Sequence, residues 1–147
     1  MTVTKDEVRQ ILSRCVEPQI RILAPPTDQE WATLVDRFSW TLPKEMRHFI
    51  DLMAEYAFPG DILNVGAGPH NGNDSIEVVH ELETRTNPSW KVEMVPFYSI
   101  GNGDYFCVSS AQGDISPVYY YFHDRETFEQ TDANFECWIR GLPEFLA

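Results

Sequence analysis

The fold is decided by residues 94–122, MVPFYSIGNGDYFCVSSAQGDISPVYYYF. Aromatic and β-branched residues fit the pleated surface of a sheet, and they gather here in three runs: residues 95–100, 105–109 and 118–122. Gly, Asn and Asp lie between the runs, as GNGD and QGD, and they supply the positive φ angles that tight turns need. The pattern predicts three strands joined as an antiparallel meander.

Helices are predicted on the N-terminal side of this meander, where apolar residues recur at helical spacing. Residues 4–7 (TKDE) and 27–30 (TDQE) have the form of capping boxes, which begin the first two helices. Pro18 is expected to close the first helix. Pro43 is expected in the first turn of the third, where its missing N–H costs nothing.

Two further helices flank the meander, and each has two candidate N-caps: Asn73 or Asp74 for the fourth, and Asp132 or Asn134 for the last. The fourth helix is expected to run to about Thr84. Residues 62–65 are expected to form a short strand, and residues 123–132 a polar, irregular segment. Three to five strands flanked by about five helices indicate an α+β fold with a central antiparallel or mixed sheet.

The chain of 147 residues is expected to form one domain, residues 1–147. In the third predicted strand, Tyr119 and Tyr121 point to one face of the sheet, and Val118, Tyr120 and Phe122 point to the other. A sheet covered on one side only is usually polar on its open face. Either helices cover both faces, or the second face is an apolar surface for a partner.

The formal net charge of −12 lies entirely in residues 51–147, which carry sixteen acids and four bases. Residues 1–50 carry seven of each. Excess carboxylates keep a protein soluble, and they also form a face that attracts a basic partner. A nucleic-acid ligand is not expected, because the acidic residues would repel its phosphates.

Three cysteines without a C-x-x-C pattern are expected to be apolar residues in a reducing compartment. No apolar run approaches the ~20 residues of a membrane span, and the first residues lack the apolar segment of a secretion signal. A cytoplasmic protein without membrane contact is therefore expected.

The motifs that could carry chemistry are weak. Residues 66–72, GAGPHNG, resemble a dinucleotide-binding loop, but the third glycine is one residue too far away, and a flexible loop is favoured. The four histidines lack metal-ligand spacing, so no metal or cofactor is expected. A small hydrolase could use His123 with Cys107 or Asp124, but a cysteine within an apolar strand is inert. A non-enzymatic protein is expected.

The assembled pattern resembles the SUKH superfamily in three stretches. The first runs from Pro25-Pro26-Thr27 through Trp31 to Leu42-Pro43 and Phe49-Ile50; the second is residues 97–108, with IGNGDYFCV; the third is PVYYYFHD at 117–124, followed by Phe135 and Trp138-Ile139. Two departures are AFPG at 57–60, where the family commonly has an Asn-Gly-Gly-like turn, and Asn134 in place of a serine.

This resemblance implies an α+β fold with a partly wrapped sheet, no enzymatic activity, and binding to a cognate bacterial toxin, often a nuclease. Nucleases are commonly basic where they hold phosphates, and an acidic inhibitor would be steered there. The alternative is a regulatory interaction module that binds an endogenous partner, as eukaryotic relatives tied to cell-wall assembly imply. Either protein is expected to be a monomer or a weak homodimer.

The candidate contacts with the partner share a negative charge or an aromatic ring on a predicted exposed surface: Glu77, Glu81, Asp104, Asp124, Glu126, Glu129, Tyr119 and Tyr121.

Overall fold

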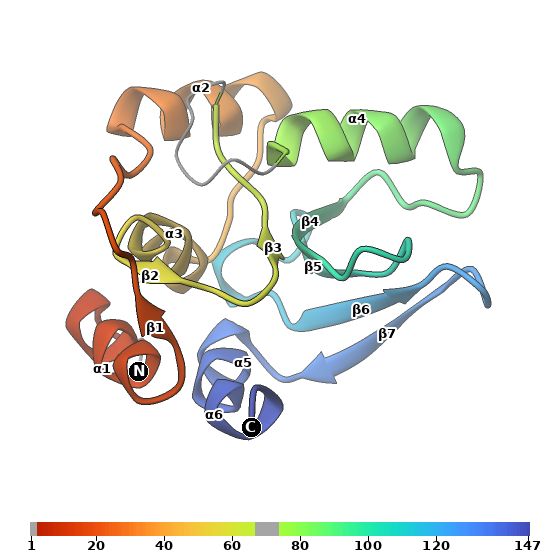
Figure 1. The fold of residues 1–147 in the computed structure, drawn as a ribbon. Helices are drawn as coiled ribbons and strands as arrows, with labels where there is room; N and C mark the ends of the chain where they lie inside the picture. Colours follow the sequence, from red (N-terminus) through yellow and green to blue (C-terminus); the bar gives the residue numbers. More distant parts are fainter. Residues whose placement is uncertain (1–2, 67–73) are drawn as a thin grey trace.

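The computed structural model describes residues 3–66 and 74–147 (Figure 1). Its centre is a sheet of five strands in the order β3-β4-β5-β6-β7, with every neighbouring pair antiparallel. The predicted meander is therefore confirmed. The strands are β3 (Asp61–Ile62), β4 (Met94–Ser99), β5 (Tyr105–Ser109), β6 (Val118–Phe122) and β7 (Thr127–Asp132).

Strand β7 corrects the expectation that residues 123–132 are irregular. Only residues 123–126 form the connecting turn, and β7 pairs with β6 from Phe122↔Thr127 to Val118↔Asp132. Most side chains of β7 are exposed, and Phe128 is its one large apolar residue. A strand at the edge of a sheet need not alternate apolar and polar residues as an inner strand does, so the sequence pattern missed it.

The helices are α1 (Lys5–Cys15), α2 (Asp28–Phe38), α3 (Lys44–Leu52), α4 (Ile76–Thr86), α5 (Phe135–Arg140) and α6 (Leu142–Phe145), with a short 3₁₀ turn at Gly113–Ile115. Both predicted capping boxes are present. Asn134 caps α5, accepting a hydrogen bond from the Cys137 N–H.

Two predicted boundaries at the ends of helices are wrong. Ser75 caps α4 in place of Asn73 or Asp74, because its hydroxyl accepts a hydrogen bond from the Val78 N–H. The first helix ends at Cys15, and Pro18 lies in the short strand β1 (Glu17–Pro18), which pairs with β2 (Tyr56–Ala57). The candidate dinucleotide loop at residues 66–72 lies almost entirely outside the described residues.

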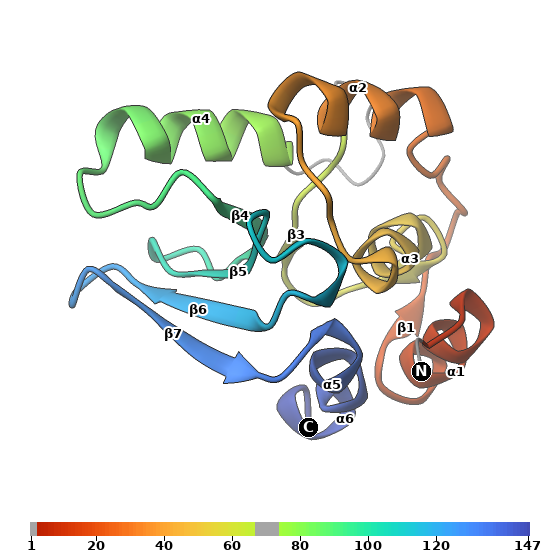
Figure 2. The ribbon, with the colours of Figure 1, turned by 180° about the vertical axis from the view of Figure 1, so that it is seen from behind.

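Helices lie on both faces of the sheet. Helix α4 lies along one face, and α5 and α6 lie against the other, next to α1 and α3 (Figures 1 and 2). On the α4 face, Trp90 packs edge-on against Tyr105 and Tyr121. On the α5 face, Trp138 packs against Phe97 and Phe106. Of the two explanations for aromatic residues on both faces, coverage by helices is therefore correct for most of the sheet.

Phe49 of α3 links the helices to the sheet. It is fully buried, and its ring lies 5.2 Å from that of Trp138 and 5.6 Å from that of Phe58. Within residues 3–66 and 74–147, no helix is both long enough and apolar enough to cross a membrane.

We expect Phe49→Ala to lower the free energy of unfolding by about 3–5 kcal/mol, because it removes a buried ring and leaves a cavity. Ile115→Ala is the matched control: Ile115 is 76% exposed, and its loss should change stability by about 0.5 kcal/mol or less. Urea unfolding followed by tryptophan fluorescence measures both. Equal effects of the two variants would contradict the placement of Phe49 in the core.

Candidate functional site

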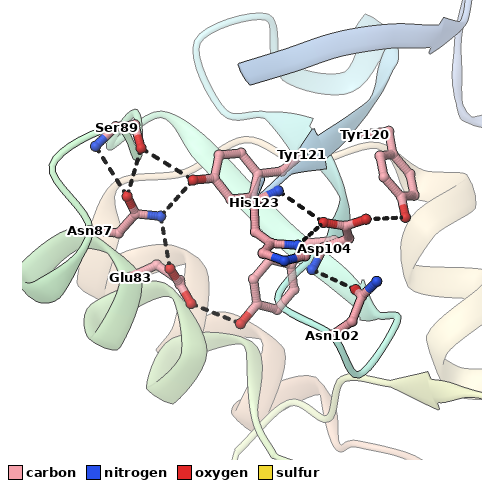
Figure 3. A network of polar contacts seen from close by, with 9 residues as sticks. Glu83, Asn87, Ser89, Asn102, Asp104, Tyr120, Tyr121 and His123 are labelled. Carbon is pink, nitrogen blue, oxygen red and sulfur yellow. Dashed lines mark hydrogen bonds and ion pairs between the residues drawn. The ribbon is translucent and has the colours of Figure 1, made fainter. Parts of the chain in front are cut away.

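The carboxylate of Asp104 joins the β4–β5 turn to the end of β6 (Figure 3). Its Oδ1 accepts hydrogen bonds from the His123 backbone N–H at 2.9 Å and from the His123 ring at Nδ1, at 2.6 Å. Its Oδ2 accepts one from the Tyr120 hydroxyl at 2.7 Å. The backbone N–H of Asp104 donates to Asn102 Oδ1 at 3.0 Å. The start of the β6–β7 hairpin is thereby tied to the neighbouring turn.

This turn depends on glycine. Gly101 and Gly103 both have φ of +98°, a region that side chains strongly disfavour. A Cβ on Gly103 would also lie 3.1 Å from the ring of His123. The GNGD sequence therefore brings the Asp104 carboxylate and the His123 ring together.

The Asp104 cluster shifts the pKa values of its members. Burial alone would raise the pKa of Asp104, but the hydrogen bonds from His123 and Tyr120 outweigh it and hold that pKa below its usual value. Burial and the bond to Asp104 raise the pKa of the Tyr120 hydroxyl. The cluster is thus an ionised carboxylate held by protein donors.

A second polar network joins α4 to the opposite face of the sheet (Figure 3). The hydroxyl of Tyr105 donates to Glu83 at 2.8 Å. The amide of Asn87 donates to Glu83 at 3.1 Å and to the hydroxyl of Tyr121 at 2.8 Å. Ser89 also contacts that hydroxyl, at 3.2 Å. These bonds satisfy the polar ends of two buried tyrosines, so large rings can pack beneath α4.

Two of the predicted contact residues therefore have internal roles. Both oxygens of Asp104 are occupied by protein donors, and Tyr121 is 2% exposed. Neither offers its side chain to a partner, and the expectation that they lie on a contact surface is corrected. Tyr119 is half-buried, and its hydroxyl donates to Gln112 at 2.6 Å.

Glu77 and Glu81 lie one turn apart on α4, and Arg37 of α2 binds both. Its guanidinium is 2.9 Å from Glu77 Oε2 and also pairs with Glu81. The mutual repulsion of the two glutamates is therefore offset, and their charges tie α2 to α4. A partner would have to compete with Arg37 for them.

The remaining predicted acids, Asp124, Glu126 and Glu129, are exposed on the β6–β7 hairpin. We call these three acids, together with the half-buried Asp132 at the end of β7, the acidic hairpin. Two bases lie near these acids. The guanidinium of Arg125 lies 3.9 Å from the centre of the Phe122 ring and 3.6 Å from Glu129, and Lys91 Nζ lies 6.0 Å from the centre of the Phe128 ring of β7. The hairpin therefore carries a net negative charge in water.

An open groove lies beside the acidic hairpin, between the sheet and the C-terminal helices. Its volume is about 310 Å³, and it is lined by Phe106, Thr131, Asp132, Trp138, Gly141, Leu142 and Phe145. We call it the aromatic groove. Sequence reasoning missed it because its residues come from β5, β7, α5 and α6, which only the tertiary structure brings together.

The hydrolase hypothesis gains no support from the residues that the structure describes. Cys107 is fully buried, and burial raises the pKa of its thiol far above the ordinary value, which leaves the thiol unreactive. The ring of His123 is bonded to Asp104 through Nδ1. In the part of the chain that the structure describes, no three metal-ligating side chains come together.

An antiparallel sheet wrapped by helices, with an acidic hairpin beside an apolar groove, defines an α+β domain suited to binding a protein. The model of a SUKH family, SUKH_5, described as SMI1-KNR4 cell-wall, matches residues 4–144. The chain therefore belongs to this family of the SUKH superfamily. Searches of curated proteins and of solved structures found no match.

We expect Asp104→Asn to lower the free energy of unfolding by about 1–3 kcal/mol at neutral pH, because a charged acceptor of three hydrogen bonds is lost. The folded-state pKa of Asp104 is depressed. Its stabilisation is therefore complete above the unfolded-state pKa of about 3.9 and is lost as pH falls through the lower folded-state pKa.

The difference between wild type and Asp104→Asn should accordingly shrink on acidification below about pH 4. Urea unfolding at a series of pH values measures this difference in stability. The matched control is Asp114→Asn, a substitution at an exposed turn residue. A difference that stays constant down to about pH 2 would show that the charge of Asp104 contributes nothing to folding.

Proposed function

We propose that this chain is an immunity-type protein that binds and neutralises a cognate bacterial toxin, a nuclease with a basic substrate cleft. It acts without catalysis, cofactor or metal, as a single cytoplasmic domain over residues 1–147. It is a monomer or weak homodimer in the free state, and it binds neither nucleic acid nor membrane.

The observation that carries this proposal is the acidic hairpin in a member of the SUKH family. Asp124 and Glu126 are exposed at the hairpin tip and form no ion pair with another side chain of the described residues. Glu129 is 53% exposed and faces Arg125 at 3.6 Å. A cleft that binds phosphates is basic, and exposed charges of opposite sign steer two proteins together.

Within the set of acids proposed from the sequence, the structure favours the hairpin over α4. Glu77 and Glu81 already bind Arg37, so a partner would gain less from them. Asp124, Glu126 and Glu129 are the acids that we propose contact the toxin.

A regulatory module that binds an endogenous protein is the second candidate. The description of the matching family, SMI1-KNR4 cell-wall, supports it. A toxin gene beside the gene for this chain would favour immunity, and its absence would favour regulation.

We expect the double variant Asp124→Lys/Glu126→Lys to weaken binding to the toxin domain that is encoded beside this chain by about tenfold or more. The matched control is Glu17→Lys/Asp36→Lys, which changes the net charge equally at two exposed acids outside the hairpin. Co-expression and pull-down identify the complex, and titration calorimetry at about 0.05 and 0.5 M salt measures its affinity.

Wild-type binding should weaken strongly at the higher salt concentration, because exposed charges are screened. Equal losses in the two double variants would remove the hairpin from the interface and leave only net charge as the cause. If the toxin domain does not bind at all, the immunity function is wrong for that pair, and the regulatory module becomes the better explanation.

A further inference from the structure

The outer edge of β7 has no strand partner in the part of the chain that the structure describes. Strand β7 is the last in the order β3-β4-β5-β6-β7, and its outer side is open in both views (Figures 1 and 2). Thr127, Glu129, Gln130 and Thr131 are exposed. An edge strand presents unpaired N–H and C=O groups, which can pair with an added strand.

The aromatic groove opens at the C-terminal end of this edge, since Thr131 and Asp132 belong to both. Phe145 stands at its rim and is 52% exposed, with its ring 5.8 Å from that of Phe106. A segment that pairs with β7 would therefore pass a space of about 310 Å³ lined mainly by apolar side chains. Such a space suits a large apolar side chain.

The acidic residues along the edge of β7 determine which kind of added segment the edge favours. Strand β7 contains Glu129 and Asp132 and no lysine or arginine, and Glu126 precedes it. Opposite charges on neighbouring strands stabilise their pairing. The edge therefore favours a segment with lysine or arginine beside its apolar residues.

We propose that β7 and the aromatic groove bind an extended basic segment of the partner protein. The segment adds to the sheet as a further strand, places an apolar side chain in the aromatic groove, and places basic side chains against Glu129 and Asp132. This inference rests on the proposed function, because the proposed toxin is the protein that supplies the segment in the cell.

A second copy of this chain is a poorer occupant of the edge. Pairing two β7 strands would bring carboxylates of both copies onto strands about 4.8 Å apart, well within the screening length of about 8 Å at physiological salt. Like charges on paired strands are destabilising. The acidic residues of β7 thus favour a basic partner and oppose self-association.

The test uses a synthetic eight-residue peptide of alternating lysine and valine, with one central lysine replaced by phenylalanine. The phenylalanine and the remaining lysines then lie on one face of the strand, as Glu129, Asp132 and the aromatic groove do on the sheet. Titration with the full chain should show saturable binding, and amide hydrogen exchange should slow in residues 127–132. A matched peptide that is N-methylated at every residue has the same charge but has no backbone N–H with which to pair as a strand. It should bind at least about tenfold more weakly, which corresponds to about 1.4 kcal/mol.

Two single variants test the groove and the edge charge separately. Phe145→Ser and Glu129→Lys should each weaken peptide binding about fivefold or more. Ile115→Ser and Glu17→Lys are the matched controls, because these residues are exposed and lie outside the groove and β7. Circular dichroism establishes that all four variants fold.

Three results would overturn the proposal: no saturable binding, equal binding of the N-methylated peptide, or slowed exchange only outside β7. Self-association through β7, detected by sedimentation, would also overturn it. The toxin experiment separates the two proposals. If the toxin binds and Phe145→Ser and Glu129→Lys leave its affinity unchanged, the immunity function stands and the edge is not its site. If the peptide binds but the toxin does not, β7 is a strand-binding edge, and the immunity function is wrong for that toxin.

Discussion

Large aromatic side chains on both faces of the sheet impose the main constraint on this structure. Tyr105 and Tyr121 require cover on one face, and Phe97 and Phe106 require it on the other. Leaving such rings in water would forfeit about 1.5–3 kcal/mol for each. Helix α4 covers the first face, and α5 and α6, backed by Phe49 of α3, cover the second. The positions of the helices follow from this requirement.

Polar groups that accompany the aromatic rings are satisfied by specific partners. The hydroxyls of Tyr105 and Tyr121 reach Glu83 and Asn87, and that of Tyr120 reaches Asp104. These bonds hold β6 from both sides and connect it to the turn before β5 and to α4. The β6–β7 hairpin thus begins at a strand whose position is fixed by hydrogen bonds as well as by packing.

The cover of the sheet is incomplete at β7, and there the surface changes character. The edge of β7 is open, the aromatic groove lies beside it, and the acidic hairpin extends from it. In an arrangement with acidic residues along an edge strand and an apolar groove at its C-terminal end, charge guides association and buried rings supply affinity. Both proposals depend on this part of the molecule and on the membership of the chain in the SUKH family.

The sequence by itself determined the elements whose signals are local. The two capping boxes, the GNGD turn and the aromatic runs specified α1, α2 and the meander, because caps, turns and strands depend on neighbouring residues. The family and the acidic surplus of residues 51–147 were also readable from it. Only the tertiary structure decided which acids are free: it buried Asp104, paired Glu77 and Glu81 with Arg37, and left Asp124 and Glu126 in water. It also revealed β7 and the aromatic groove, because an edge strand and a groove are defined by residues distant in sequence, whose contacts no local pattern records.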